Sequence, residues 1–255
     1  MVTGIILLAV VAFVGVISYR RPRLEQRVFK KIPLIDWINI LILPMAGYLA
    51  MVLILKNILS RNLVPILDFD QFYLLSIGVL FFIYSFVGLA IHFVGKVLSR
   101  YISPNKHSLI YQVNEVFHGK LSHYMGFIFV SLTIFTLALL EINHPLPILI
   151  SGISRLILIS AGILFGVSSA KSILIPHQWF GGYNKPLFAL VFVQTMILFI
   201  IFNGNGLRWG YYPVNLFIIS MCVSLLVSFA ARQILILTRL NSRSRFRIFA
   251  RIFSA

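Results

Sequence analysis

Long apolar runs alternate with short polar segments along the whole chain. A transmembrane α-helix needs about 20 mostly apolar residues to cross a hydrocarbon core about 30 Å thick. Runs of this kind recur seven times, and the first has no basic residues ahead of it, the reverse of a secretory signal peptide. The runs cover residues 2–19, 33–55, 72–95, 124–142, 147–170, 186–203 and 212–235. The pattern predicts an all-α integral membrane protein, with a seven-transmembrane-helix bundle as one domain over residues 1–238.

The composition excludes an ordinary soluble domain. Hydrophobic residues make up 60% of the chain and charged residues only 11%, whereas about a quarter of the residues in soluble domains are charged. The net charge of +16 is divided among short segments between the apolar runs, which is typical of orientation signals and of contact with lipid headgroups. We therefore expect the lipid bilayer as the main partner, a membrane protein as a further one, and no nucleic acid.

The basic residues between the runs predict an orientation. When alternate loops are assigned to opposite sides, 18 Lys and Arg residues fall on one side and 3 on the other. Because lysine and arginine accumulate on the cytoplasmic side, the N-terminus is predicted to lie outside and the C-terminus in the cytoplasm. We expect a multi-pass protein of a prokaryotic inner membrane, although the same charge rule operates in eukaryotic membranes.

The C-terminal tail, residues 239–255, interleaves arginine with aromatic and aliphatic residues. At helical spacing, Phe246, Phe249 and Phe253 share one face, the pattern of a basic amphipathic helix. The tail is predicted to lie on anionic lipids of the inner leaflet. The alternative is a frayed basic tail that only fixes the orientation.

The longest polar connection joins the third and fourth runs. A second surface-lying or re-entrant helix is predicted there, over residues 108–117, with its end at Gly119.

The stretch from Asn114 to Pro145 carries the most candidate chemistry, because it holds two of the six acids and three of the six histidines. Glu115 and His118 are three residues apart, so on a helix they share a face. His123 is five residues beyond His118, about 140° around a continuous α-helix. It joins the other two only if the chain bends at Gly119.

These residues suggest a metal site at the predicted cytoplasmic face. Glu115, His118 and His123 would hold Zn or Fe, with His92 or His177 as a fourth ligand. Five of the six histidines fall on that side. The favoured interpretation is a set of interfacial histidines that contribute hydrogen bonds and pH-dependent charge, with no cofactor, and the metal site is the alternative to it.

Two segments bear a resemblance to a known family. His118-Gly-Lys-Leu-Ser-His123 resembles the His-x-x-x-Thr-His segment of a family of bacterial membrane-bound metal-dependent hydrolases. Glu141-Ile-Asn-His-Pro145 resembles the Asp-x-Asp-His-Pro segment of the same family. The two segments stand in reversed order here, so no catalytic role is carried over to these residues.

Arg155 is the one charged residue deep in a predicted span, about eight residues into the fifth. Such a charge needs a partner or must reach the interface. We expect a pair between Arg155 and Glu141, with His144 nearby, or else snorkelling of Arg155 to the outer surface. Gln194, in the middle of the sixth span, is expected to hydrogen-bond to a neighbouring helix or to line a cavity.

Several functions are excluded by missing motifs. The seventh span has no lysine for a retinal Schiff base, and the chain has no Gly-rich phosphate loop, Gly-x-Ser-x-Gly elbow or His-Glu-x-x-His. The favoured function is therefore a non-enzymatic accessory, sensory or small-ligand- or lipid-binding bundle with a polar pocket around Arg155. The alternatives are a membrane-embedded metal-dependent hydrolase at the cytoplasmic face and a small transporter. No residue is assigned a catalytic role.

Overall fold

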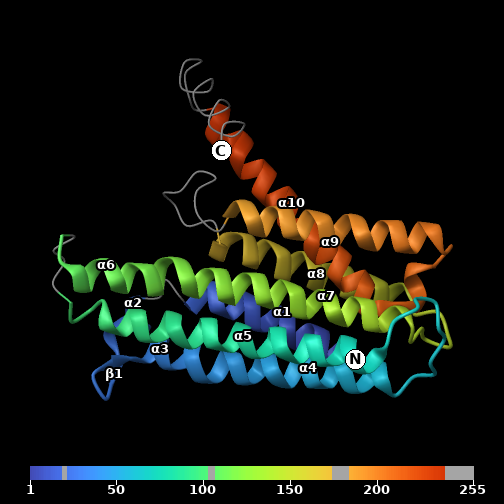
Figure 1. Ribbon diagram of the computed structural model, residues 1–255, viewed down its shortest axis with the longest axis horizontal. Helices are drawn as coiled ribbons and strands as arrows, with labels where there is room; N and C mark the ends of the chain where they lie inside the picture. The colour runs from blue at the N-terminus through green and yellow to red at the C-terminus, as the bar shows by residue number, and fades with distance from the viewer. Residues whose placement is uncertain (19–21, 103–106, 174–183, 239–255) are drawn as a thin grey trace.

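The computed structural model describes residues 1–18, 22–102, 107–173 and 184–238, drawn as coloured ribbons in Figure 1. The predicted tail helix over residues 239–255 and the candidate ligand His177 lie outside these ranges.

The described chain is almost entirely helical. Its strands β1 and β2 have two residues each and pair as a short antiparallel hairpin. The elements are α1 (Val2–Ser18), α2 (Pro22–Gln26), β1 (Val28–Phe29), β2 (Ile32–Pro33), α3 (Leu34–Trp37), η1 (Ile38–Ile42), α4 (Leu43–Leu59), α5 (Gln71–Leu98), α6 (Leu109–Glu115), η2 (Val116–Leu121), η3 (Tyr124–Ile128), α7 (Phe129–Ile142), α8 (Gly152–Ile173), α9 (Asn184–Gly204), η4 (Trp209–Tyr211) and α10 (Pro213–Thr238).

Six helical stretches of the described chain are long and apolar enough to cross a membrane. They are Leu34–Leu59, Gln71–Leu98, Leu109–Ile142, Gly152–Ser172, Pro186–Gly204 and Pro213–Leu235. Helix α1 is also apolar but has only 17 residues. The predicted class, an all-α multi-pass membrane protein, is confirmed in six of the predicted spans. Large apolar side chains such as Ile153 and Phe72 are more than 70% exposed, as expected of surfaces that face lipid.

The predicted helix end at Gly119 is wrong. The chain stays helical from Leu109 to Ile142, and Ser108 caps its start by accepting a hydrogen bond from the Tyr111 backbone N–H. Among the described glycines only Gly206 has a positive φ, so Gly119 keeps an ordinary helical backbone. A glycine inside a helix costs only about 0.5–1 kcal/mol relative to alanine, which packing along this long helix overrides.

The helices pack as a bundle in which α10 crosses obliquely to the other long helices (Figure 1). Helix α8 approaches α10 closely through Gly162 and Gly166, since a Cβ added at Gly162 would lie 2.5 Å from the backbone oxygen of Phe217. The Gly-x-x-x-Gly spacing therefore serves packing within the bundle. Helix α1 packs against α4 and α8.

Helix α5 presents a seam of small residues to the long helix that runs from α6 to α7. Gly78, Ser85, Gly88 and Gly95 are all buried on α5. Their spacing repeats at seven residues, which is the period of a coiled-coil seam. His92 follows Ser85 by seven residues and so lies on the same seam. Because glycine carries no side chain, the two backbones come close enough for His92 to meet side chains of the facing helix.

Candidate functional site

Three histidines meet where the end of α5 packs against η2 and η3. The ring centres of His92 and His118 are 4.7 Å apart, those of His92 and His123 are 4.8 Å apart, and those of His118 and His123 are 6.3 Å apart. All three side chains are half-buried. We call His92, His118 and His123 the histidine cluster.

The histidine cluster exists because the helix changes its winding. The stretches η2 and η3 are π-helical, and at the end of η2 the backbone N–H of Ser122 bonds to the oxygen of Phe117, five residues earlier. In a π-helix residues five apart lie one turn apart, so His118 and His123 come onto the same side. The offset of about 140° expected from an α-helix does not apply. A change of winding, and not a bend at Gly119, brings His123 beside His118.

Hydrogen bonds fix the tautomer of one ring and favour that of a second. Nδ1 of His123 lies 2.8 Å from the Gly119 carbonyl oxygen, and since a carbonyl only accepts, Nδ1 carries the proton. The Ser122 hydroxyl donates to the His118 carbonyl oxygen at 2.5 Å, so its oxygen accepts from Nδ1 of His92 at a long 3.4 Å. The lone pair of His123 is therefore on Nε2, and the same tautomer is favoured in His92. No ring nitrogen of His118 hydrogen-bonds to a described residue.

The predicted ligand set is brought together only in part. His92, His118 and His123 are adjacent, but Glu115 is exposed at the end of α6 and forms no ion pair with a described histidine. As the side chains stand, the described residues include no group of three or more His, Cys, Asp or Glu that could hold a metal ion. His177 is not among the described residues.

Glu141 lies at the opposite end of the bundle, and its partner is Arg61, not Arg155. Oε1 of Glu141 accepts from Nη1 of Arg61 at 2.8 Å, and Glu141 is fully buried. Arg61 also donates to the side chain of Asn57 and to the backbone oxygen of His144. The expected Glu141–Arg155 pair is not formed. Arg61, in the loop after α4, pairs with the Glu141 carboxylate instead.

Glu141 also holds the start of α10. Its carboxylate accepts from the backbone N–H groups of Val214 and Asn215, at 3.1 and 2.7 Å, and from the Asn215 side chain at 3.0 Å. The first N–H groups of a helix lack partners within the helix and favour negative charge, so Glu141 satisfies both needs. We call Arg61, Glu141 and Asn215 the glutamate node. Burial, and then the neighbouring Glu141, raise the pKa of Tyr212 above its usual value.

Arg155 is half-buried near the start of α8. Its Nε donates to the backbone oxygen of Ile150 at 3.2 Å. Its guanidinium group packs beside Gly210, where an added Cβ would lie 3.2 Å from Nη2. Arg155 therefore ties two loops together at the end of the bundle, which agrees with the alternative of snorkelling rather than with a buried pair.

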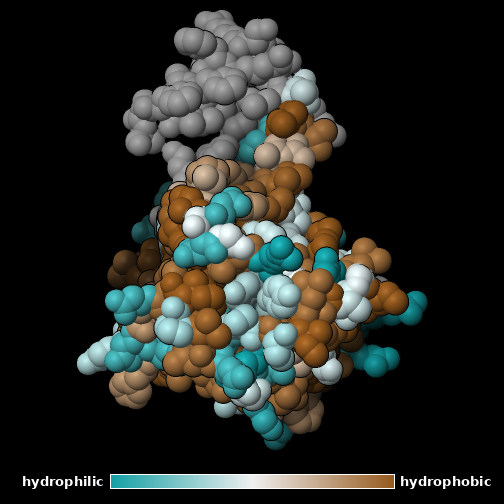
Figure 2. Space-filling model, turned by 90° about the vertical axis from the view of Figure 1, so that its right-hand side faces the viewer, coloured by the Kyte–Doolittle hydropathy of each residue, from teal (hydrophilic) through white to brown (hydrophobic). Residues whose placement is uncertain are grey.

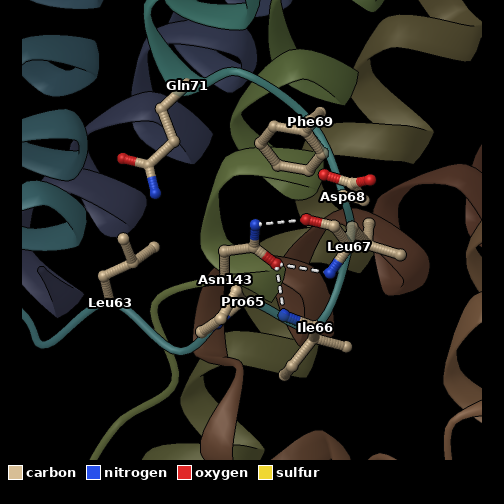
Figure 3. A pocket seen from close by; sticks show the side chains of 8 residues that line it. All are labelled: Leu63, Pro65, Ile66, Leu67, Asp68, Phe69, Gln71 and Asn143. Atoms are coloured by element: carbon tan, nitrogen blue, oxygen red, sulfur yellow. Dashed lines mark hydrogen bonds between the residues drawn. The ribbon is translucent and has the colours of Figure 1, made fainter.

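The residues after Glu141 anchor the loop between α4 and α5. Oδ1 of Asn143 accepts from the backbone N–H groups of Ile66 and Leu67, and Nδ2 donates to the oxygen of Leu67 (Figure 3). Nε2 of His144 lies 3.3 Å from Oε1 of Gln71.

A hollow of about 530 Å³ lies beside this loop, lined by Leu63, Pro65, Ile66, Leu67, Asp68, Phe69, Gln71 and Asn143. Figure 2 views this end, where hydrophilic residues lie among hydrophobic ones.

Gln194 is buried in the middle of α9 and bonds to a neighbouring helix, as predicted. Its Oε1 accepts from the Ser131 hydroxyl of α7 at 2.7 Å, whereas its Nε2 has no partner in the described chain.

The sequence analysis missed two residues, Arg61 and Asp36. Asp36 is 1% exposed, and its carboxylate pairs with Lys96 at 2.5 Å and with Arg100 at 2.8 Å, which joins α3 to the end of α5. An acid inside a predicted span needs a cation nearby, so the position of Asp36 within residues 33–55 was a usable signal.

Comparison of the chain with protein-family models, with curated proteins and with solved structures finds no match.

Proposed function

We propose that this chain is a non-enzymatic seven-helix membrane protein that binds a transition-metal ion at the histidine cluster, in a sensory or accessory role. The observation that carries the proposal is the meeting of three imidazoles from two separate helical segments. Neutral imidazole is the protein ligand that suits Zn, Cu, Fe and Ni.

The ring spacing supports a shared ion. Zn–N bonds of about 2.0–2.1 Å place the centres of two imidazoles on one tetrahedral ion about 5 Å apart. Two of the three spacings in the cluster, 4.7 and 4.8 Å, are near this value. The third, 6.3 Å, is about 1 Å too long, so one ring must turn when the ion binds. His118 can turn most easily because its ring nitrogens hold no described hydrogen bond.

The ring hydrogen bonds support the same proposal. Histidines that bind metal commonly donate their other N–H to a carbonyl or another acceptor, which fixes the tautomer and the ring orientation. Nδ1 of His123 donates to the Gly119 oxygen, and Nδ1 of His92 faces the Ser122 hydroxyl. In these tautomers Nε2 carries the lone pair that coordinates a metal ion.

A site around Arg155 has weaker support. Arg155 is engaged with the Ile150 carbonyl, and Glu141, its predicted partner, is saturated by Arg61 and the start of α10. The histidine cluster therefore replaces Arg155 as the proposed ligand site.

The proposed topology keeps seven spans, with the N-terminus outside and the C-terminus in the cytoplasm of a prokaryotic cell. The 17 residues of α1 extend about 26 Å, near the lower limit for a span. The excess of 18 Lys and Arg over 3 places the histidine cluster at the cytoplasmic end. Residues 239–255 would bind anionic lipids of the inner leaflet.

The test is zinc binding by the purified full-length protein in detergent, measured by competition with a chromophoric chelator. Wild type should bind one ion per chain. His92→Ala and His118→Ala should each weaken binding at least tenfold, whereas His107→Ala, which removes an exposed histidine outside the cluster, should not. Equal zinc affinity in wild type and both cluster variants would refute the proposal. Thermal unfolding of each variant confirms that it is folded.

The two other functions give different results in the same preparation. A metal-dependent hydrolase would need a carboxylate base, and Glu115 is the nearest in sequence, so Glu115→Gln would abolish its activity without removing the metal. A transporter would move zinc into sealed proteoliposomes. Metal binding without either result supports the sensory or accessory role.

A further inference from the structure

Two lysines form the tip of the hairpin between β1 and β2. The register pairs Phe29 with Ile32, so Lys30 and Lys31 make up the whole loop. Their φ angles are 51° and 65°, both in the left-handed region of backbone conformation. Among the residues other than glycine that the structure describes, only these two have a positive φ.

This backbone conformation is costly for lysine. A two-residue loop between antiparallel strands favours a type I′ turn, which needs a positive φ at both positions and is usually built from Asn-Gly, Asp-Gly or Gly-Gly. A Cβ atom strains the left-handed conformation, and long side chains adopt it rarely. The turn itself therefore gives no reason for lysine at either position. Strained residues held in place by their surroundings are frequent where a protein contacts a ligand.

The surrounding residues hold the strained loop in place. The Tyr101 hydroxyl donates to the Lys31 oxygen at 3.2 Å, and Nε1 of Trp37 donates to the Phe29 oxygen at 3.1 Å. The rings of Phe29 and Trp37 meet edge to face, with their centres 6.1 Å apart. The buried Asp36 ties α3, which follows the hairpin, to the end of α5. The two lysines are therefore presented from a fixed support.

The loop lies at a membrane interface, and its charges are unmatched. Strand β2 leads directly into Leu34–Leu59, which is long and apolar enough to cross a membrane, so the tip stands at the level of the lipid headgroups. Figure 1 shows the hairpin at the end of the bundle where α6 begins. Lys30 and Lys31 are exposed and form no ion pair within the described chain. Beside them, Val28 and Phe29 are each 60% exposed.

We propose that this hairpin is a binding site for the headgroup of an anionic phospholipid. The ammonium groups of Lys30 and Lys31 contact the headgroup phosphate, and Val28 and Phe29 contact the first part of the acyl chains. The partner is a membrane lipid rather than a soluble phosphate, because a soluble phosphate would leave the two apolar side chains in water. The site is separate from the histidine cluster and does not depend on metal binding there.

The test uses Trp37 as a fluorescent reporter, because its ring touches the hairpin. The other two tryptophans are removed by Trp179→Phe and Trp209→Phe, and the full chain is reconstituted in vesicles of phosphatidylcholine and phosphatidylglycerol at one fixed ratio. In parallel samples, bromine atoms that quench Trp37 are carried on the acyl chains of either the neutral or the anionic lipid. Comparison of the two samples gives the enrichment of the anionic lipid beside the hairpin. We expect an enrichment of about fivefold over the bulk ratio, which falls as the salt concentration rises.

A second loop sequence separates lipid binding from folding. Lys30→Asn with Lys31→Gly introduces the favoured residues of a type I′ turn and removes both charges. The unfolding temperature of this variant should equal or exceed that of the natural loop, while the enrichment should fall below about twofold. Arg23→Gln with Arg27→Gln is the matched control, because it removes two exposed charges from the same segment outside the loop. It should keep more than half of the enrichment.

Equal enrichment with the natural loop and with the Asn-Gly loop would overturn the proposal, and so would no enrichment with either. A loss in the arginine control as large as that in the loop variant would also overturn it, because the attraction would then belong to the whole basic segment. A loop variant less stable than the natural loop would show that the lysines serve the fold. Zinc affinity should be the same in all these proteins, so failure of this proposal leaves the proposed function standing.

Discussion

The glutamate node and the histidine cluster, at opposite ends of the bundle, hold their polar groups in different states. In the glutamate node the charges are matched, because Glu141 accepts hydrogen bonds from Arg61, from the Asn215 side chain and from two backbone N–H groups. In the histidine cluster the rings lie against one another, Nδ1 of His123 donates to a carbonyl oxygen, and Nδ1 of His92 lies 3.4 Å from a hydroxyl. Both sites bring together helices that are far apart in sequence, but only the glutamate node pairs an acid with a base.

This difference favours a structural role for the glutamate node and a binding role for the histidine cluster. The buried ion pair of the glutamate node holds helices together, and its carboxylate, which accepts from Arg61 and from the start of α10, leaves little capacity for a ligand. A group of neutral imidazoles without an acid keeps its coordinating capacity. Charged residues inside a membrane protein are functional candidates by default, yet here the uncharged cluster is the better candidate for function and the charged node the better one for stability.

Removing the acid of the glutamate node should have the largest effect. Glu141→Leu leaves Arg61 buried without its counter-ion and the first N–H groups of α10 without an acceptor. Breaking a buried pair from one side costs about 3–5 kcal/mol. We expect a loss of this size in the free energy of unfolding, measured by denaturant titration in mixed micelles.

The double variant Arg61→Leu with Glu141→Leu tests whether the loss comes from the orphaned charge. It should recover part of the stability, since apolar replacement of a whole buried pair is often close to neutral. Glu25→Gln, which affects an exposed pair at 3.8 Å, serves as the control and should change stability by less than about 0.5 kcal/mol. A Glu141→Leu protein as stable as Glu25→Gln would show that the node is not structural.

The sequence predicted the bundle because membrane spans depend on local composition. Six predicted runs correspond to long apolar helices within about five residues at each end, apart from the fourth. The fourth helix starts at Leu109 instead of residue 124, because the polar segment around His118 is incorporated as a π-helix. Extra residues in a helical turn leave no signature in hydropathy, so the change of winding was not predictable from the pattern.

The sites were predicted in part for a related reason. Glu141, His118 and His123 were singled out because polar groups are rare in this chain, and the structure places them at buried or half-buried positions. Their partners were not, since Arg61 is 80 residues from Glu141 and pairing over that distance depends on how the helices pack. In the sequence His92 was only one of two candidates for the fourth ligand. The structure shows that it lies beside His118 and His123, on the small-residue seam of α5.

Disturbing the seam should have an intermediate effect, confined to the histidine cluster. A Cβ at Gly95 would lie 2.6 Å from the Cβ of His118, so Gly95→Ala must push η2 away from α5. We expect zinc affinity to fall about tenfold, with a loss of stability of about 1–3 kcal/mol from overpacking. Chelator competition measures the first and denaturant titration the second.

Gly119→Ala is the matched control for this variant. It changes a glycine in the same contact region, but its nearest new neighbour would be Oε2 of Glu115 at 3.8 Å, an ordinary contact distance. Zinc affinity should stay within a factor of two of wild type. If Gly95→Ala binds zinc as tightly as Gly119→Ala does, the spacing between α5 and η2 does not determine the site.

The smallest effect is expected for a change at Arg155, and its comparison with Arg61 distinguishes the roles of the two arginines at this end of the bundle. Arg155→Leu removes one hydrogen bond, from Nε to the Ile150 oxygen, at a half-buried position and leaves no acid unpaired. A hydrogen bond of this length at a half-buried position contributes at most about 1 kcal/mol to the free energy of unfolding. We expect a change below this value in the free energy of unfolding and unchanged zinc affinity. Arg61→Leu, which orphans Glu141, should cost several times as much by the same measurement. Equal losses for the two arginine variants would mean that Arg155, and not the glutamate node alone, holds this end of the bundle together.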